Sequence, residues 1–210
     1  NLVHQPVSPA AVPLTLESRR DFGAEVQAPS AILRFNIPKS SIWQRLTGAG
    51  FARFEAGDLL GVIPEGSTMP RFYSLASNAA DGFLEIVVRR QPGGLCSGQL
   101  TALEPGRTAQ AFLKPNPAFR MAEDRKPVIL VGAGSGIGPL AGFIRANAQR
   151  RPIHLFFGMR HAASDFLYDE ELQQWRAEGR LSHLVTAASR GRRPYYVQDA
   201  LQAEAESVVR

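Results

Sequence analysis

A glycine-rich segment, Gly132-Ala-Gly-Ser-Gly-Ile-Gly-Pro139, places the strongest constraint on how this chain can fold. It follows a compact apolar run at residues 128–131 and precedes residues 137–148, where apolar residues recur at helical spacing. A buried strand, a tight turn and a helix in this order form a βα unit. Free backbone N–H groups at the start of such a helix attract anions, so we expect a phosphate site here. A tight turn that binds no ligand is the alternative.

The βα pattern occurs twice more along the second half of the chain. A predicted strand at residues 153–157 leads to a helix at 168–177, and a strand at 181–187 leads to a helix at 197–209. Three βα units imply a parallel sheet with helices packed against it. Such sheets usually contain more strands, so we expect residues 123–210 to form an α/β domain that is truncated at its C-terminus.

The first half of the chain has a different rhythm, because Pro, Gly, Asn and Asp break it into short apolar runs. A short helix is expected at residues 40–46, and the turn at 78–82 should close a hairpin between the fourth and fifth strands. We therefore expect an antiparallel β module, a barrel or a sandwich. Its six predicted strands are residues 14–19, 32–37, 59–63, 72–76, 84–88 and 109–113.

Composition narrows the classes of partner and of compartment. The single cysteine, Cys96, excludes an internal disulfide and any multi-cysteine metal site, so we expect no metal and a reducing, cytoplasmic location. Basic residues outnumber acidic ones by 24 to 19, and 21 of the 24 are Arg, whose planar guanidinium binds phosphates and carboxylates. This excess of positive charge favours anionic partners in general and does not single out nucleic acid.

No stretch of the sequence is suited to crossing a membrane. The longest uncharged run, residues 128–144, is shorter than the roughly 20 residues that span a bilayer, and it contains five Gly and one Pro. The N-terminus does not resemble a signal peptide, and the chain opens at Asn1 rather than Met, so we expect a piece of a longer protein. A membrane anchor of that protein would lie outside these residues.

Two features of the α/β half bear on the kind of nucleotide. The glycine segment departs from the dinucleotide fingerprint G-x-G-x-x-G, because Ile137 takes the last glycine position. No acid ends the second strand to hold a ribose, and Arg160 stands there instead. The tract Ser189-Arg-Gly-Arg-Arg193 ends the third strand, and its guanidinium groups could hold a 2′-phosphate, which favours NADP over NAD. A solvated basic loop is the alternative for this tract.

The β half contains two candidate segments of its own. In Arg71-Phe-Tyr-Ser74, strand alternation puts Arg71 and Tyr73 on one face, where the ring could stack on a flat ligand and the guanidinium could bind its phosphate. A core position is the alternative for Tyr73. The segment Gly93-Gly-Leu-Cys-Ser-Gly98 precedes a short helix expected at 98–103 and would form a second backbone cradle for phosphate. Cys96 by itself is more often a small buried residue.

In this order, the segments at 71–77, 94–97 and 132–139 resemble those of the ferredoxin–NADP reductase superfamily. The segments at 156–172 and 189–198 resemble its diflavin branch, which is the reductase half of sulfite reductase flavoprotein and of cytochrome P450 reductase. The resemblance extends from about residue 12 to the end of the chain. It implies an antiparallel β-barrel that binds FAD at residues 1–122, followed by a parallel-sheet domain for NADPH at residues 123–210.

The resemblance also assigns roles to matching residues. On the FAD side, Arg71 would contact the pyrophosphate, Tyr73 would stack against the isoalloxazine, and Ser74 would be the catalytic contact near flavin N5. The FAD pyrophosphate would also be held by Gly94, Leu95, Cys96 and Ser97. The NADPH pyrophosphate would be held by Gly132, Gly134, Ser135, Gly136 and Arg160. The adenosine 2′-phosphate and adenine would be held by Ser189, Arg190, Arg193, Tyr196 and Gln198.

The sequence departs from the family pattern at three points. The family places a Lys between the Ser-Arg pair and the Tyr, whereas this tract is one residue shorter, so Arg193 or Arg192 would substitute. The helical connecting insertion of the diflavin branch is absent between Asp58 and Arg71. The family's final strand with its Cys-Gly pair and its C-terminal aromatic residue are also absent, and Cys96 belongs to a different motif.

The resemblance implies a flavoprotein oxidoreductase that transfers hydride from NADPH to FAD and then passes single electrons to a flavodoxin-like FMN domain or another acidic redox partner. Three alternatives stay open. The first is a stand-alone reductase of ferredoxin or flavodoxin, and the second is an FAD-binding domain without turnover. The third is a basic scaffold or nucleic-acid-binding protein, whose binding would depend steeply on salt.

Overall fold

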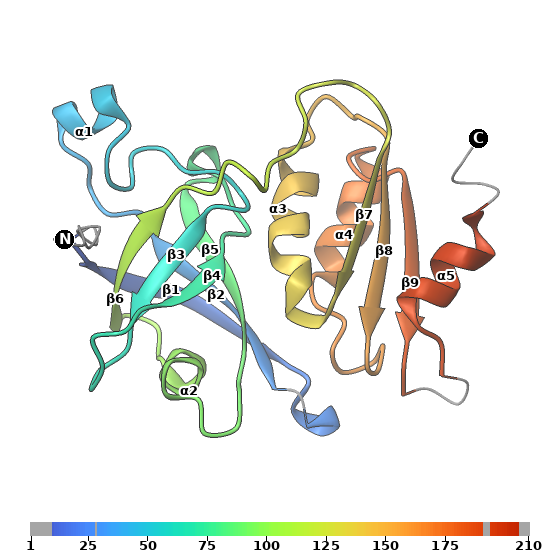
Figure 1. The fold of residues 1–210 in the computed structure, drawn as a ribbon, viewed down its shortest axis with the longest axis horizontal. Helices are drawn as coiled ribbons and strands as arrows, with labels where there is room; N and C mark the ends of the chain where they lie inside the picture. The colour runs from blue at the N-terminus through green and yellow to red at the C-terminus, as the bar shows by residue number, and fades with distance from the viewer. Residues whose placement is uncertain (1–9, 28, 191–193, 206–210) are drawn as a thin grey trace, which may run out of the picture.

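The computed structural model describes residues 10–27, 29–190 and 194–205. The chain forms two parts that lie side by side, an antiparallel barrel and an α/β part (Figure 1). The barrel ends with Lys114 and the first parallel strand begins at Val128, so the expected boundary near residue 122 falls in the connection between them. The position of that boundary stays a prediction.

Six antiparallel strands form the first part, in the order β4-β3-β6-β1-β2-β5. A bridge between Leu75 and Ile86, together with a hydrogen bond from the backbone N–H of Ala76 to the carbonyl of Glu85, joins the two ends of the sheet and closes it into a barrel. The barrel prediction is therefore confirmed. The strands are β1 (Val12–Phe22), β2 (Ser30–Asn36), β3 (Leu59–Ile63), β4 (Arg71–Ser74), β5 (Phe83–Arg89) and β6 (Thr108–Lys114).

The hairpin expected between the fourth and fifth strands is confirmed only at its closing end, where Leu75 forms an antiparallel bridge with Ile86. β4 forms its ladder with β3, where Tyr73 lies opposite Leu60, and only the residues after β4 reach β5. The turn is wider than a hairpin loop, because Asn78 precedes a short 3₁₀ helix, η2 (Ala79–Asp81), and its side chain accepts a hydrogen bond from the backbone N–H of Ala56. These polar contacts hold the turn in place at the end of the barrel.

Two short helices accompany the barrel. The first, α1 (Ile42–Thr47), begins two residues later than predicted because Ser41 caps it, with its hydroxyl accepting from the backbone N–H of Gln44. The second, α2 (Leu95–Ala102), begins three residues earlier than predicted, and Gly94 is its N-cap residue. Cys96 and Leu100 of α2 belong to the core inside the barrel. The helix therefore covers that core directly after the turn.

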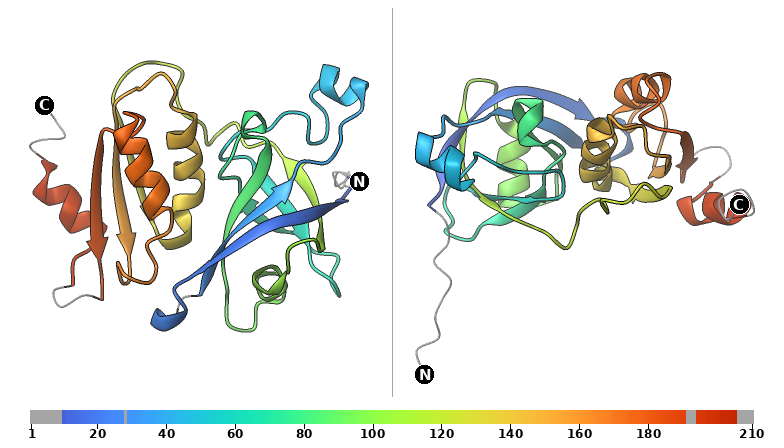
Figure 2. Two further views of the ribbon diagram at one scale, coloured as in Figure 1. Left: turned by 180° about the vertical axis from the view of Figure 1, so that it is seen from behind. Right: turned by 90° about the horizontal axis from the view of Figure 1, so that it is seen from above.

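The second part is a three-stranded parallel sheet in the order β7-β8-β9. The helices α3 and α4 lie between the sheet and the barrel, and α5 packs on the opposite face (Figures 1 and 2). The three predicted βα units are confirmed, although the last residues expected in the third helix lie outside the described range. The elements are β7 (Val128–Ala133), η3 (Gly134–Gly136), α3 (Ile137–Ala146), β8 (Ile153–Met159), α4 (Asp169–Ala177), β9 (His183–Ala188) and α5 (Val197–Ala203).

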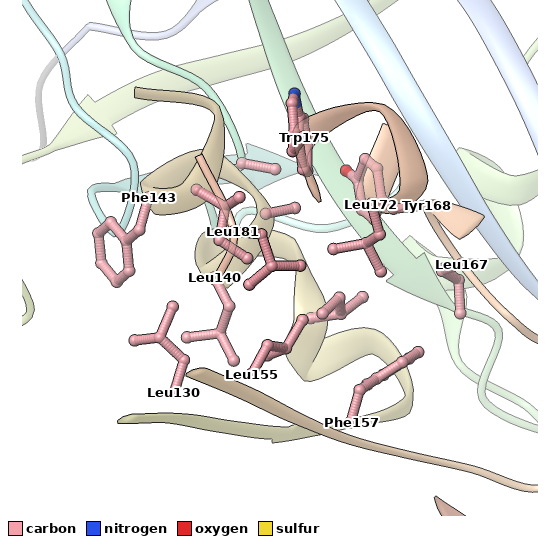
Figure 3. Packing of buried hydrophobic residues seen from close by; sticks show 14 of the residues in the cluster. Leu130, Leu140, Phe143, Leu155, Phe157, Leu167, Tyr168, Leu172, Trp175 and Leu181 are labelled. Carbon is pink, nitrogen blue, oxygen red and sulfur yellow. The ribbon is translucent and has the colours of Figure 1, made fainter. Parts of the chain in front are cut away.

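One hydrophobic core crosses from the barrel into the α/β part. The buried side chains of α3, α4 and the sheet, drawn in Figure 3, belong to the same cluster as Val87 and Ala76 of the barrel. Gly138 and Gly142 lie one turn apart on α3 and face the barrel. A Cβ atom on Gly142 would lie 2.5 Å from the Cβ of Ala56, so glycine is what allows the helix to pack this closely.

Candidate nucleotide-binding site

The segment 71–74 forms β4 at one end of the barrel sheet. Tyr73 is half-buried and packs against the barrel core, and Arg71 on the same strand is exposed. Phe72 on the opposite face meets the ring of Phe112 edge to face, with centroids 6.0 Å apart. Ser74 is half-buried at the end of the strand. The alternation predicted from the sequence therefore holds, with an aromatic ring and a guanidinium on one face.

The segment 94–97 forms the turn into α2. A Cβ on Gly94 would lie 2.6 Å from Oγ of Ser97, so only glycine fits there without a shift. The Ser97 hydroxyl accepts from the backbone N–H of Gln91 at 3.1 Å and donates to the carbonyl of Gly94 at 3.4 Å. The Ser97 hydroxyl is therefore occupied in holding the turn. The first backbone N–H groups of α2, which no side chain caps, are the groups that could bind a phosphate.

The structure brings these two segments together. The Tyr73 and Cys96 side chains lie close enough to influence each other's pKa, and the charge of Arg71 acts on both. Burial raises the pKa of Tyr73 and also raises the pKa of Cys96, so both side chains are neutral near pH 7. Cys96 is a buried core residue, which is the alternative that the sequence analysis gave for it. Its contribution to an anion site would therefore come from its backbone.

The glycine segment forms the turn from β7 into α3. A Cβ on Gly132 would lie 2.7 Å from Cδ1 of Leu140, whereas Cβ atoms on Gly134 or Gly136 would have no neighbour within 4 Å. Gly134 has φ +52°, in the left-handed region that favours glycine. Gly136 is the N-cap of α3, and no side chain caps this helix. The turn is thus closed on its core side and open on the other, with the first N–H groups of α3 at its edge.

Arg160 and Arg190 follow β8 and β9, and backbone contacts hold them together. The N–H of Arg190 donates to the carbonyl of Arg160 at 2.9 Å, and Ser189 donates to the carbonyl of Met159 through its N–H and its hydroxyl. The buried carboxylate of Asp165 accepts from the backbone N–H of Arg160 at 2.9 Å. Arg160 and Arg190 therefore follow the carboxyl ends of two neighbouring strands, and their contribution to a phosphate site stays a prediction.

Arg89, at the end of β5, is a member of this group that the sequence analysis missed. Partial burial and the positive charges of Arg89 and Arg190 lower the pKa of Arg160, so each of these two charges lies close enough to act on Arg160. β5, the strand that ends at Arg89, contacts both α2 and η3. The available signal was an Arg-Arg pair directly before the turn at 92–94. Cations that repel each other in this way form a site suited to an anion of multiple charge.

The remaining candidates lie at the start of α5. Tyr196 is its N-cap residue and is 50% exposed, and Gln198 is exposed on the first turn. Val197 lies over Gly158 of β8, since a Cβ on that glycine would be 3.5 Å from the Cβ of Val197. Arg193, like Arg192, lies outside the described residues. The structure thus places Tyr196 at the same carboxyl end of the sheet without testing the contribution of Arg193.

A cavity between the two parts of the chain lies away from these residues. It has a volume of about 830 Å³ and lies between the barrel and the amino end of the parallel sheet, with Arg53, Arg125 and Arg150 among its lining residues. None of the predicted cofactor residues lines it. Within the described residues, no group of three or more His, Cys, Asp or Glu is placed to hold a metal ion. No described helix is long and apolar enough to span a bilayer.

Comparisons with known proteins place these features in context. Residues 130–209 match the family described as an oxidoreductase NAD-binding domain. The chain is 34% identical over 155 residues to the sulfite reductase [NADPH] flavoprotein alpha-component of Neisseria meningitidis serogroup A, a match that covers 66% of this chain and 26% of that protein. It is also 34% identical over 173 residues to NADPH oxidoreductase A of Dictyostelium discoideum, covering 75% and 27%.

A solved structure shares the fold. The ferredoxin-NADP+ reductase of Plasmodium falciparum superimposes with a TM-score of 0.76 at 16% sequence identity, over 95% of this chain and 80% of that one. The chain spans about a quarter of the length of the curated relatives it matches. The same order of barrel and parallel sheet therefore recurs in a protein with little sequence identity.

Proposed function

The chain belongs to the ferredoxin–NADP reductase superfamily and is related to the flavoprotein component of sulfite reductase, and from this premise we propose that it is an NADPH-dependent flavin oxidoreductase. In this proposal FAD is bound by the barrel and NADPH by the α/β part. The observation that carries it is the carboxyl end of the parallel sheet, where the open glycine turn 132–136 follows β7 and Arg160 and Arg190 follow β8 and β9.

The residues present fit FAD. The exposed guanidinium of Arg71 and the first N–H groups of α2 offer positive charge and donors to a pyrophosphate. A Cβ on Gly93 of the same turn would have no neighbour within 4 Å, so the backbone is open to close approach by a ligand at that residue. The half-buried ring of Tyr73 offers a flat apolar face beside these donors. A flat ring joined to a pyrophosphate is the chemistry that this set recognises.

The residues also fit NADPH. The open side of Gly134 and Gly136 leaves space next to the first N–H groups of α3, where a second pyrophosphate would be held. Arg190 and Ser189 would hold the 2′-phosphate, which distinguishes NADPH from NADH. The half-exposed ring of Tyr196 would stack on the adenine, with Gln198 beside it. The assignment of each residue to a part of the cofactor is a proposal.

The chain's own residues would align the reactants. FAD, when bound, supplies the chemistry that accepts a hydride and releases electrons singly. Ser74, at the end of β4, would donate its hydroxyl hydrogen bond at flavin N5 and so orient the ring. The shared core that carries Gly138 and Gly142 fixes the barrel relative to the parallel sheet, which fixes the two nucleotide sites relative to each other. Arg160 would balance the charge of the NADPH pyrophosphate.

We propose an acidic electron-transfer protein, a flavodoxin-like FMN domain or a free protein, as the acceptor. The net charge of +5 supports this class of partner through electrostatic attraction. The name of the relative, sulfite reductase flavoprotein, supports a partner that receives electrons. A cytoplasmic location is part of the same proposal and rests on the single buried cysteine.

A stand-alone reductase is the second candidate. The superposition on the ferredoxin-NADP+ reductase of Plasmodium falciparum covers 80% of that chain, with a TM-score of 0.76. The two candidates differ in their acceptors. Reduction of a fused or added FMN domain, with no reduction of ferredoxin, supports the first, and the reverse supports the second. An FAD-binding domain without turnover would reduce neither acceptor.

The test is an absorbance spectrum of the purified protein, with FAD added where it has been lost, before and after anaerobic NADPH. We expect flavin bands that bleach with NADPH and bleach less with NADH. Bands that only dithionite bleaches would indicate an FAD-binding domain without turnover. A protein that takes up no flavin would overturn the proposal and favour the basic scaffold, which would then show salt-dependent binding to nucleic acid.

A further inference from the structure

The helix α1 carries three large apolar side chains that the described part of the chain leaves exposed. Ile42 is 75% exposed, Trp43 is 77% exposed and Leu46 is 69% exposed. Ile42 and Leu46 lie one turn apart, and Trp43 is adjacent, so the three form one apolar face. We call this face the α1 tip. Exposed apolar side chains gathered in one place are typical of an interaction surface.

The α1 helix holds its shape without burying these side chains. The Ser41 hydroxyl accepts from the backbone N–H of Gln44, and the Gln44 side chain accepts from the N–H of Ser41 at 2.8 Å. Gly48 ends the helix with φ +71°, a left-handed conformation that suits glycine. Caps at both ends stabilise a helix of less than two turns, so the α1 tip is presented outward by local structure.

The α1 tip projects from the end of the molecule that lies away from the candidate nucleotide site. Figure 1 shows α1 at the upper end of the barrel, whereas α2 and the carboxyl ends of β7–β9 lie at the lower end. Figure 2 shows α1 at the far side of the barrel from the α/β part. A surface bound at the α1 tip would therefore leave the glycine turns accessible.

Cations surround the base of α1. A groove of about 440 Å³ between the helix and the barrel is lined by Lys39 and Arg53, both exposed. Arg53 lies against the end of the helix, since a Cβ on Gly48 would be 3.0 Å from its Cδ. Arg53 also lines the wider cavity near the interface together with Arg125 and Arg150. The basic surface therefore continues from α1 across the same end of the molecule.

Two of the three acidic residues that line the wider cavity are paired with arginines, and the third is Glu123. Glu55 is paired with Arg120 at 3.0 Å, and Asp124 with Arg151 at 2.6 Å. In the part of the chain that the structure describes, Arg53 forms no ion pair with any carboxylate. The charge that faces outward beside the α1 tip is thus positive, which complements an anionic surface.

We propose that the α1 tip, with Lys39 and Arg53, inserts into the surface of an anionic lipid bilayer. Trp prefers the boundary between headgroups and acyl chains, aliphatic side chains enter the acyl region, and cations contact the headgroups. The tip consists of three side chains, which is small beside the roughly 800 Å² that a stable protein partner covers. The contact is peripheral and does not depend on the proposed function.

Tryptophan fluorescence tests the insertion, because the chain has two Trp residues in different environments. Trp43 is exposed, whereas Trp175 is 5% exposed within the core. With vesicles of phosphatidylcholine and phosphatidylglycerol in equal parts, we expect the emission to shift to shorter wavelength and brominated lipid to quench it. Vesicles of phosphatidylcholine alone should give weaker binding. In Trp43→Phe, both the shift and the quenching should disappear.

Co-sedimentation with the same vesicles tests the residues. Ile42→Ser with Leu46→Ser should weaken binding about tenfold or more, because the apolar insertion is lost. Lys39→Glu and Arg53→Glu should each weaken vesicle binding by about fivefold or more. Added salt should weaken vesicle binding of the native protein to a similar extent. The matched control is Met69→Ser, which removes another exposed apolar side chain, 63% exposed, from the β3–β4 connection. It should bind as the native protein does.

Three results would overturn the proposal. One is a Trp emission that the vesicles leave unchanged. Another is a set of α1 variants that bind vesicles as tightly as Met69→Ser, while their thermal unfolding matches that of the native protein. The third is an emission shift that depends on protein concentration without lipid and disappears in Trp43→Phe, because a second copy or another protein would then cover the α1 tip.

Discussion

Glu85 of β5 and Arg145 of α3 form a buried ion pair that joins the barrel to the α/β part, with Oε1 of the carboxylate 2.7 Å from Nη2 of the guanidinium. Arg34 reaches the other carboxylate oxygen at 2.8 Å, and the Tyr168 hydroxyl donates to Oε1 at 2.9 Å. Arg145 also donates to the carbonyl of Ala76. A charge that is fully buried persists only when its partners satisfy it, so this cluster ties four elements to one arrangement.

Replacing Arg145 with Ala should destabilise the protein strongly. Glu85 is fully buried, and loss of this partner would leave it with less compensation, at a cost of about 3–5 kcal/mol. The measurement is the free energy of unfolding in urea. The matched control is Asp21→Ala, which removes the exposed ion pair with Arg19 and should cost less than about 1 kcal/mol. Equal losses in the two variants would contradict the role of the buried pair.

The same cluster predicts how stability depends on pH. Burial alone would raise the pKa of Glu85, but the charges and hydrogen bonds of Arg145 and Arg34 outweigh it and lower that pKa. A carboxyl with a lower pKa in the folded chain stabilises it above the unfolded pKa, and this contribution is lost as the pH falls through the folded pKa. We expect the free energy of unfolding to decrease as the pH is lowered past about 4, and to decrease less steeply in Glu85→Gln. Parallel pH profiles would contradict this.

Local patterns predicted the local elements well. The strand at 59–63 was predicted to the residue, and the glycine segment was correctly placed between a strand and a helix. Both depend on neighbouring residues alone: apolar runs set the strands, and glycine sets the turns. The position of Arg160 and Arg190 at one edge was also predictable, because the carboxyl ends of parallel strands lie together.

Features that depend on distant packing could not be predicted in this way. The pairing of β4 with β3 rather than β5 follows from how the barrel closes, and the turn residues do not encode it. Gly138 is read as part of a phosphate loop in the sequence, whereas in the structure it packs against Val87 of the barrel. Arg89 joins the cluster only because β5 contacts both α2 and η3. Such roles require the tertiary arrangement.

Replacing Arg89 with Ala should weaken the binding of NADPH. One charge-assisted hydrogen bond to a phosphate contributes about 1.5–3 kcal/mol, which corresponds to a loss of about tenfold to a hundredfold in affinity. Isothermal titration calorimetry of the FAD-loaded protein measures it. Arg90→Ala is the control, since Arg90 follows the end of β5 and is exposed. If both variants bind NADPH as the native protein does, Arg89 has no part in the site.

Replacing Arg190 with Ala should reduce the preference for NADPH over NADH. Arg190 follows β9 next to Arg160, where a guanidinium can pair with a 2′-phosphate that NADH lacks. The dissociation constant for NADPH should rise while that for NADH stays unchanged, as equilibrium titrations with each nucleotide would show. A preference that does not change would move this role to Arg192 or Arg193.

Replacing Gly94 with Ala should reduce the retention of FAD, because the new Cβ would lie 2.6 Å from Oγ of Ser97 and 3.0 Å from the Cβ of Gln91. The turn would shift, and with it the first N–H groups of α2. Gly98→Ala is the matched control: it adds the same methyl group to the same helix, where no atom lies within 4 Å. Alanine is favoured over glycine within a helix by about 1 kcal/mol, so this variant should keep its flavin and unfold at slightly higher urea. Flavin absorbance per protein after gel filtration measures retention, and equal flavin content in the two variants would show that the start of α2 does not hold the cofactor.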